Sequence, residues 1–202
     1  MSLRLTVSRL RIHGVGPIDL TIDRGACLGL AGPSGSGKTL LLRAIADIDS
    51  HGGDVCLDGI EQARIPAPDW RRQVALLPAE SMWWFDRVGD HFHLSDERRF
   101  EHVGFHPDVL DWSISRLSSG ERQRLALLRL LENRPRVVLL DEPTANLDPD
   151  NTERVEQVMR TYRHETEAAI IWVGHHRDQL RRVATRTVAL DNRGRLLSGD
   201  NP

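Results

Sequence analysis

The sequence predicts an α/β protein in which a mainly parallel sheet carries an antiparallel β part and a short inserted helical lobe. Three observations predict this fold class. Strand-like apolar runs alternate with helix-compatible stretches, a glycine-rich loop joins a strand to a helix within residues 26–48, and strand-like runs disappear between residues 79 and 133. We therefore expect one domain over residues 1–202, with its core in 1–78 and 134–202 and a helical subdomain at about 79–133.

The elements expected before residue 79 are mostly strands. Residues 3–7 and 18–22 alternate apolar and polar side chains, as half-buried antiparallel strands do. Residues 26–32 form a more continuous apolar run that suits a central strand, and a helical stretch follows at 39–48. Two further strands are expected at 54–59 and 73–78.

Core elements return after the predicted lobe. Residues 137–143 have the pattern of a buried strand, 151–163 that of an amphipathic helix, and 168–176 that of another strand. Residues 185–190 and 193–199 are expected to form a hairpin.

The composition is that of an ordinary globular protein, with 40% apolar and 28% charged residues and a net charge of -2. That charge gives no basic field for nucleic acid or an anionic membrane. The N-terminal ten residues lack the apolar segment of a signal peptide, and apolar runs such as 168–173 are far shorter than the ~20 residues of a membrane helix. Cys27 and Cys56 lie in strand-like stretches, and we expect buried thiols of a cytoplasmic protein.

The stretch GPSGSGKT at residues 32–39 fits the phosphate-binding loop G-x-x-x-x-G-K-[ST]. Its backbone N–H groups and the following helix N-terminus would wrap a polyphosphate. Lys38 is the only lysine, and its compact ammonium suits this loop better than the larger planar fork of arginine. Thr39 would bind Mg²⁺. The expected nucleotide contacts are Gly32, Pro33, Ser34, Gly35, Ser36, Gly37, Lys38, Thr39 and Leu40.

Two carboxylates end the apolar strand VVLLDE at residues 137–142. Asp141 could hold Mg²⁺ through water, and Glu142 could act as general base on the attacking water. Taken alone, an apolar strand that ends in acids is often just a strand meeting a turn. The phosphate loop about 100 residues upstream favours the catalytic interpretation, although the loop alone leaves the P-loop family open.

The order of five motifs narrows the family. LSSGE (117–121) is followed by the helical stretch 122–131, the acidic strand, ANLD (145–148) and His175. With these residues the sequence resembles the ATP-binding cassette (ABC) ATPases over essentially its whole length. The family carries a signature usually written LSGGQ, then a helix, an apolar strand ending in DE, a turn ending in LD and a switch histidine.

The resemblance implies that ATP binds between two subunits. Ser118, Ser119 and Gly120 of one subunit would contact the ATP held by the glycine loop of the other. Asp148 would link the two sites, and His175 would contact the γ-phosphate and help to orient the attacking water. Catalysis is thereby assigned to Lys38, Glu142 and His175, and the metal to Thr39, Asp141 and Glu80.

Glu80 enters that set because the chain departs from the family pattern. The glutamine that the family places after a strand falls on Ala79, and Glu80 is the only nearby group that could replace it as metal and water contact. The family's adenine-stacking aromatic is also missing near residues 9–16, where only Ile12 or His13 could pack. Ser119 stands where glycine is usual.

The predicted lobe opens with four large side chains, Met82, Trp83, Trp84 and Phe85. In the resembled family this region receives a helix of the membrane subunit, so the aromatics fit an interface anchor, and equally the lobe's own core. The four histidines of this region do not have spacings that require convergence, so surface positions are favoured over a metal site for His91, His93, His102 and His106.

The functional prediction is an ATPase subunit that binds ATP and Mg²⁺ and powers an ABC transporter. Its partners would be a second nucleotide-binding subunit, with a homodimer favoured, and a separate transmembrane permease, without nucleic acid. It would lie on the inner face of the membrane through that permease. Two alternatives remain at this point: a soluble ABC ATPase of DNA repair or translation, and a regulatory cassette that barely turns ATP over.

Overall fold

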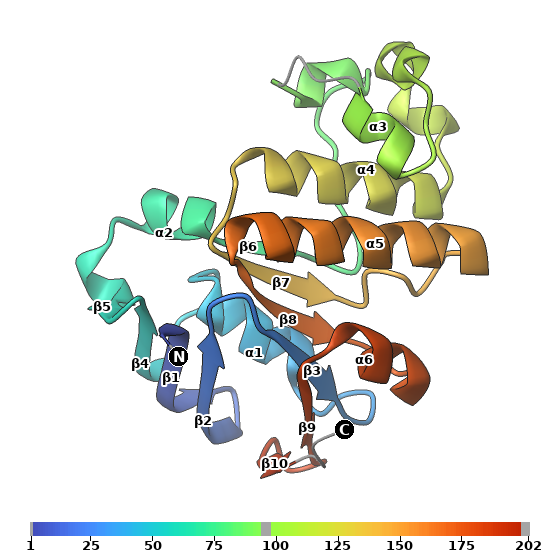
Figure 1. Ribbon diagram of the computed structural model, residues 1–202. Coiled ribbons are helices and arrows are strands. Elements are labelled where there is room, and N and C mark those ends of the chain that lie inside the picture. The colour runs from blue at the N-terminus through green and yellow to red at the C-terminus, as the bar shows by residue number, and fades with distance from the viewer. Residues whose placement is uncertain (1, 94–97, 199–202) are drawn as a thin grey trace.

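The computed structural model describes residues 2–93 and 98–198. Its strands form two sheets, and a helix packs against both of them (Figure 1). The larger sheet has six strands in the order β10-β9-β3-β8-β7-β6, and all its neighbours are parallel except β10 and β9. Its strands are β3 (Cys27–Ala31), β6 (Val74–Leu77), β7 (Val137–Asp141), β8 (Ala169–Val173), β9 (Arg186–Leu190) and β10 (Leu196–Ser198). The predicted mainly parallel sheet is confirmed.

The smaller sheet is antiparallel and has the order β2-β1-β4-β5. Its strands are β1 (Leu3–Ile12), β2 (Val15–Asp23), β4 (Gly52–Leu57) and β5 (Ile60–Glu61). The alternating pattern places one face of β1 and β2 in the core and the other in solvent, as expected for a sheet covered on one side. The final hairpin is described as far as Ser198, and Gly199 lies outside the described residues.

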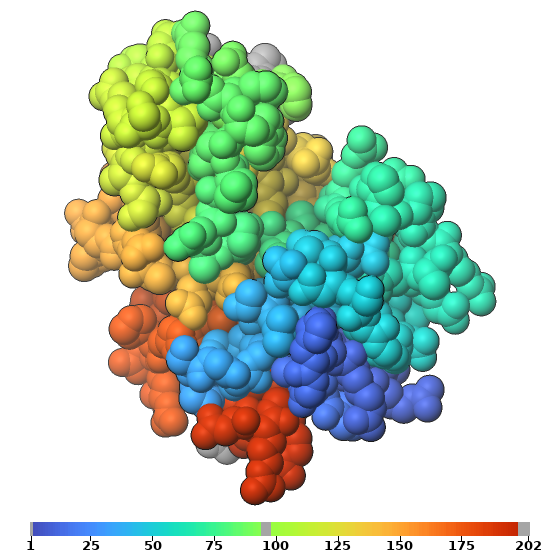
Figure 2. All heavy atoms as spheres, turned by 180° about the vertical axis from the view of Figure 1, so that it is seen from behind, coloured from blue at the N-terminus to red at the C-terminus, as the bar shows by residue number. Residues whose placement is uncertain are grey.

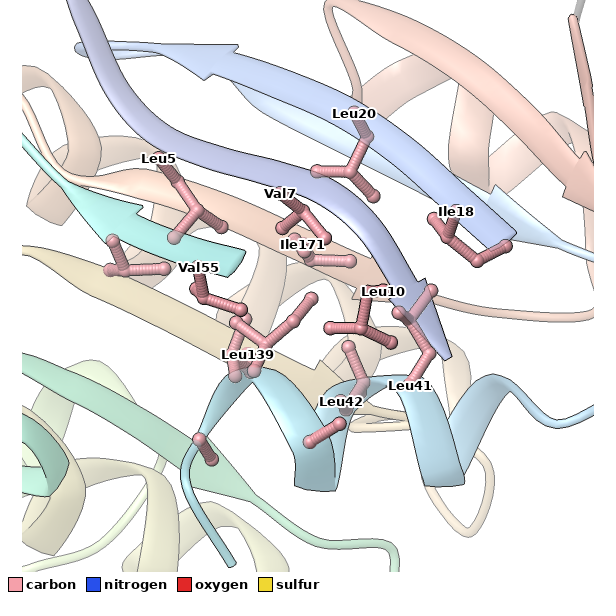
Figure 3. Close-up of a cluster of buried hydrophobic side chains, with 14 of the residues drawn as sticks. Leu5, Val7, Leu10, Ile18, Leu20, Leu41, Leu42, Val55, Leu139 and Ile171 are labelled. Atoms are coloured by element: carbon pink, nitrogen blue, oxygen red, sulfur yellow. The ribbon is translucent and has the colours of Figure 1, made fainter. Parts of the chain in front are cut away.

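One hydrophobic core lies between the two sheets and around α1 (Lys38–Ile45). Figure 3 shows side chains of β1, such as Leu5 and Leu10, meeting Leu41 of α1 together with Leu139 and Ile171 of the larger sheet. Every second residue of β7 and β8 points into this core, because successive side chains of a strand face opposite sides.

The other face of the larger sheet is covered by α4 (Ser119–Glu132), α5 (Pro149–Thr166) and α6 (Arg177–Val183). Val138 and Leu140 of β7 and Trp172 of β8 pack against apolar residues of these helices. The molecule is therefore layered, with α1 and the antiparallel sheet on one face of the parallel sheet and α4 to α6 on the opposite face.

The segment between β6 and β7 contains helices and no named strand among its described residues, and residues 94–97 lie outside the described ranges. It has its own apolar cluster, formed around Phe100, Val109 and Leu125, and α4 connects that cluster to the sheet. From behind, this segment stands out at one end of the molecule in green to yellow (Figure 2). Its elements are three short 3₁₀ turns, Gly89–His91, Pro107–Asp111 and Ile114–Arg116, with α3 (Arg98–His102) and α4.

Two short helices were not anticipated from the sequence. Alongside a 3₁₀ turn at Gln62–Arg64, α2 (Ala67–Gln73) buries Trp70, whose indole N–H donates to Ile45 O at 2.9 Å. Like α6, α2 has seven residues, so neither is long enough to display a clear helical period. Tertiary contacts rather than local pattern define them.

Candidate nucleotide-binding and catalytic site

The glycine loop connects β3 to α1, as the sequence predicts. Gly37 precedes α1 with φ of 96°, and a Cβ there would lie 2.3 Å from Val15 Cγ2. Gly32 has φ of 147°, and a Cβ there would lie 2.6 Å from Leu190 O. Both positions combine a backbone conformation that L side chains rarely adopt with no room for a side chain. The loop can therefore turn its N–H groups inward at the start of α1.

Lys38 is the first residue of α1, and only 6% of it is exposed. Its Nζ donates to Gly32 O at 3.0 Å and to Pro33 O at 2.9 Å. An ammonium has three donors, so one remains for an anion in the loop. Beside it, Ser36 Oγ is buried and has no hydrogen-bond partner. A buried cation and an unpartnered hydroxyl fit a phosphate ligand at this position.

The predicted metal ligands Thr39 and Asp141 are brought together. Thr39 Oγ1 donates to Asp141 Oδ2 at 2.8 Å, which joins the first turn of α1 to the end of β7. Burial raises the pKa of Asp141, and the hydrogen bond from Thr39 only partly opposes that shift. A hydroxyl and a carboxylate in contact are the hard oxygen donors that suit Mg²⁺, and a bound cation would offset the cost of burying the carboxylate.

Asp141→Asn is expected to raise the melting temperature of the nucleotide-free protein while lowering Mg²⁺-dependent ATP turnover at least ~100-fold. Because the pKa of Asp141 is raised in the folded state, stability is lost as pH rises from the ordinary aspartate pKa to the raised one. The difference in melting temperature between variant and wild type should be largest near neutral pH and shrink on acidification. Thermal unfolding at several pH values measures it, and a wild type that stays the more stable at neutral pH would contradict the expectation.

Glu142 and His175 follow neighbouring strands. Asp141 of β7 is paired with Val173 of β8, so the residues just beyond both strands emerge at the same edge of the sheet. His175 Nε2 and Glu142 Oε1 are 2.6 Å apart, and both side chains are partly exposed. Glu142 has φ of 51°, a left-handed conformation that is uncommon outside glycine and recurs at functional sites. The predicted base and the predicted switch histidine are thus in direct contact.

The signature residues begin α4. Ser118 caps the helix: its Oγ accepts from Glu121 N at 3.2 Å, and Glu121 Oε2 accepts from Ser118 N at 2.8 Å. This capping box is worth about 1 kcal/mol of helix stability. Gly120 lies against the turn before α5, where a Cβ would be 2.9 Å from Asn146 O. The first turn of α4 therefore packs closely against the ANLD turn.

Asp148 ends that turn and caps α5. Its Oδ1 accepts from Asn151 N at 2.8 Å, and this backbone N–H holds the pKa of Asp148 below its usual value. Pro149 occupies the first helical position, where its missing N–H costs nothing. The helix predicted at 151–163 accordingly begins two residues earlier and ends at Thr166.

The loop after β6 carries Ala79 and Glu80, and both are exposed. The adjoining residues are held by Gln123 of α4, which the sequence did not single out. Gln123 Nε2 donates to Pro78 O at 3.0 Å, and Ser81 Oγ donates to Gln123 Oε1 at 2.8 Å. No local pattern indicated this contact, because Ser81 and Gln123 are 42 residues apart. The role of Glu80 stays a prediction.

The four large side chains at residues 82–85 were interpreted as either an interface anchor or part of the lobe's core, and each interpretation fits some of them. Trp83 is partly buried and packs against both clusters that α4 contacts. Met82, Trp84 and Phe85 are 74%, 64% and 50% exposed. The guanidinium of Arg129 lies 4.4 Å from the ring centre of Trp83 and 4.7 Å from that of Trp84. Trp83 therefore belongs to the core, and the other three side chains form an apolar surface patch, called here the aromatic patch.

The surface position expected for His91 is wrong, since only 4% of this residue is exposed. Its Nε2 accepts from the N–H groups of Trp84 and Phe85, each at 3.1 Å, and its Nδ1 lies 3.0 Å from Arg87 O. The imidazole is buried because it satisfies the backbone of the aromatic segment. His93, His102 and His106 are exposed as expected, and the described residues contain no group of three side chains suited to a metal.

The expectation that both cysteines are buried is corrected, and the choice of residues that could contact adenine is narrowed. Cys27 is buried and free, and burial raises its pKa to about 12, but Cys56 is only partly buried. Cys56 lies on β4 between the buried Val55 and Leu57, so its side chain faces away from the core. Of the two residues considered for the adenine, Ile12 is buried in the core and His13 is exposed at the β1–β2 turn.

Fold and site together define a P-loop ATPase domain, with a glycine loop, a Thr–Asp oxygen pair and a carboxylate–histidine pair on one sheet. The family model described as ABC transporter matches residues 15–145, and the chain belongs to that family. Its function is that of an ATP-binding and ATP-hydrolysing subunit in ABC transport. Within the described residues, no helix combines the length and apolar character needed to cross a membrane.

Three relatives illustrate the match. The chain is 31% identical over 220 residues to the tungstate uptake system ATP-binding protein TupC of Peptoclostridium acidaminophilum, covering 98% of this chain and 99% of TupC. It is 32% identical over 180 residues to protein STAR1 of Oryza sativa subsp. japonica, covering 83% of this chain and only about half (52%) of STAR1. The ATP-binding cassette MJ0796, solved as a dimer in a post-hydrolysis state with ADP and Pi, has a TM-score of 0.84 at 19% identity, covering 98% of each chain. That last likeness is one of fold.

Proposed function

We propose that two copies of this chain bind two ATP molecules at a shared interface and drive a separate membrane permease. One observation supports the proposed dimer. The anion-binding N-terminus of α1 belongs to the layer on one face of the parallel sheet, whereas the signature at the N-terminus of α4 belongs to the layer on the opposite face. Each chain thus offers two separate half-sites for phosphate, and a second copy can complete both.

Each residue of the site then has a defined task. Lys38 and Ser36 bind the phosphates, while Thr39 and Asp141 would hold Mg²⁺, which would supply positive charge to offset that of the phosphates. Glu142 takes the proton of the attacking water, and His175, 2.6 Å away, orients that carboxylate and the water. Ser118 with the N–H groups of Ser119 and Gly120 covers the partner's γ-phosphate.

Glu80 is proposed to complete the metal site in place of the glutamine that Ala79 replaces. It lies exposed on the loop that Gln123 holds, so its carboxylate is free to turn toward a bound cation. Glu80→Ala should raise the Mg²⁺ concentration needed for half-maximal turnover. An unchanged Mg²⁺ titration of turnover would exclude this role.

The shared interface is tested by mixing two inactive variants. Lys38→Ala removes the phosphate cation, and Ser118→Arg blocks the signature at the exposed start of α4. A mixed dimer contains one site with both defects and one intact site. A 1:1 mixture should therefore recover about a quarter of wild-type turnover, because half of the dimers are mixed and each has one of two sites. Turnover that stays at the level of the separate variants would mean that each chain completes its own site.

We propose the aromatic patch as the docking surface for the permease. Its side chains are large, apolar and exposed, and Arg129 holds the segment by donating to Met82 O at 2.9 Å while stacking on Trp84. Rigid aromatic groups on a surface carry much of the binding energy at protein interfaces. Binding here would place the helical segment against the membrane subunit.

Trp84→Ala is expected to reduce sedimentation with membrane vesicles from the source cells at least ~10-fold, with little change in melting temperature. The indole is 64% exposed, so its removal leaves no cavity. Ile60→Ala, an equally apolar change at an exposed position on β5, is the matched control. Trp83→Ala should instead lower the melting temperature. Full sedimentation of the Trp84 variant would contradict the docking role.

A further inference from the structure

Three polar side chains form a cluster that the roles assigned above do not use. Thr144 lies in the turn after β7, Glu156 on α5 and Gln179 in the first turn of α6. Glu156 is 5% exposed and Gln179 6% exposed. Burying a carboxylate and an amide is costly unless each is hydrogen-bonded, so their contacts must be specific.

The three side chains of this cluster are connected by hydrogen bonds through Gln179. Gln179 Nε2 donates to Thr144 Oγ1 at 2.9 Å and to Glu156 Oε1 at 3.0 Å, which uses both of its hydrogens. Thr144 Oγ1 donates in return to Gln179 Oε1 at 3.1 Å. Arg182, one turn further along α6, donates to Glu156 Oε1 at 2.8 Å and to Oε2 at 3.3 Å. The charge of the buried carboxylate is thereby compensated.

The carboxylate determines which way the amide points. If the amide of Gln179 were turned over, its oxygen would face Glu156 Oε1, and two acceptors would meet without a proton between them. Glu156 therefore acts as a fixed anion that presents the Gln179 amide to Thr144 in one orientation.

The two segments joined in this way are those that carry the proposed base and switch. Thr144 is two residues after Glu142, and Gln179 is four residues after His175. The cap of α6 is His176, directly after His175, so a shift of α6 would move His175 with it. The Glu142–His175 contact is made by partly exposed side chains, whereas Gln179, which contacts Thr144, is only 6% exposed.

We propose that Gln179 is a positioning residue for ATP hydrolysis, which holds the segment of His175 against the segment of Glu142, with Glu156 orienting its amide. This inference rests on the proposed roles of Glu142 and His175. Gln179 itself does not contact the reacting atoms. It sets the separation between two groups that do, and a displacement of about 1 Å between such groups can cost ~100-fold in rate.

Gln179→Met tests the role, because methionine keeps the length and volume of the side chain and removes all three hydrogen bonds to the amide. We expect kcat to fall at least ~10-fold while KM for ATP stays within about twofold, since the glycine loop is untouched. Gln157→Met, the same change at an exposed position on α5, is the matched control. Normal kcat in the folded variant, with or without a lower melting temperature, would overturn the proposal.

A second pair of variants gives a readout that loss of stability alone would not produce. Gln179→Glu places two carboxylates where the amide and Glu156 met, so they must share a proton. Its kcat relative to wild type should rise as pH is lowered from about 8 to 6, because the shared proton restores a donor. Adding Glu156→Gln supplies that donor at all pH values, so the double variant should recover activity and lose the pH dependence. A single variant whose pH profile matches wild type would contradict the proposal.

The proposed function can fail separately from this inference. If Glu142→Gln leaves turnover unchanged, the base has been misassigned, whatever the Gln179 variants do. If Glu142→Gln abolishes turnover and Gln179→Met does not reduce it, only the positioning role is wrong.

Discussion

Glu142→Gln is expected to slow ATP turnover by about 10²–10⁴-fold, the range of a lost general base. The amide oxygen of glutamine can still accept from His175 at the present 2.6 Å contact, so the geometry survives and only the basicity is lost. ATP should still bind, because the glycine loop and the Thr39–Asp141 pair are unaltered. ATP bound without hydrolysis should then hold two copies together, and the variant should elute as a dimer with ATP and as a monomer without it.

Steady-state phosphate release and light scattering measure these two outcomes. Glu101→Gln, the same chemical change at an exposed position of α3, should behave as wild type. The comparison also separates an ATPase from a regulatory cassette. Equal and near-zero turnover in wild type and in Glu142→Gln would favour the regulator, in which Ala79 and the missing adenine aromatic have abolished hydrolysis.

Lys38→Arg is expected to weaken ATP binding about 100-fold although the charge is kept. Nζ lies within 3.0 Å of both Gly32 O and Pro33 O, and the residue is nearly fully buried. A planar guanidinium needs more room than this closed loop offers, and forcing it in costs about 1–3 kcal/mol, with tenfold in affinity for each 1.4 kcal/mol. The lost phosphate contact of the ammonium adds to that cost.

Equilibrium binding of a fluorescent ATP analogue measures the effect. Arg43→Lys is the matched reverse exchange on the same helix, at a partly exposed guanidinium that pairs with Asp49. It should leave ATP affinity within about twofold, since surface ion pairs contribute little. ATP binding by Lys38→Arg at wild-type affinity would show that the only lysine of the chain is replaceable.

The parts of the site that could be predicted from sequence are those in which neighbouring residues make the structure. The glycine loop requires positive φ angles and close approach at Gly32 and Gly37, which only glycine permits, so its sequence specifies its shape. Ser118 caps the helix that it starts. The acids of VVLLDE lie at the end of a strand whose apolar pattern is local. The same locality explains why the succession of most strands along the chain and the α/β class were predicted correctly.

What could not be predicted depends on residues distant in the chain. His91 was expected at the surface because an isolated histidine usually lies there. It is buried instead, and its Nε2 accepts hydrogen bonds from the backbone N–H groups of Trp84 and Phe85. Gln123 reaches the loop after β6 across 42 residues, and Gln179 reaches Thr144 across 35. The local sequence around a glutamine does not indicate which residue its side chain contacts, so only the packed structure reveals these contacts.

The sequence by itself determined the chemistry: an anion loop with one ammonium, a hydroxyl and two acids, and a second anion site at the signature. The tertiary structure decided which of these groups meet. It joined Thr39 to Asp141 and Glu142 to His175, and it put α1 and α4 on opposite faces of the sheet. The physical reason is that a short motif specifies its own backbone, whereas the distance between two motifs is set by the sheet and helices packed between them.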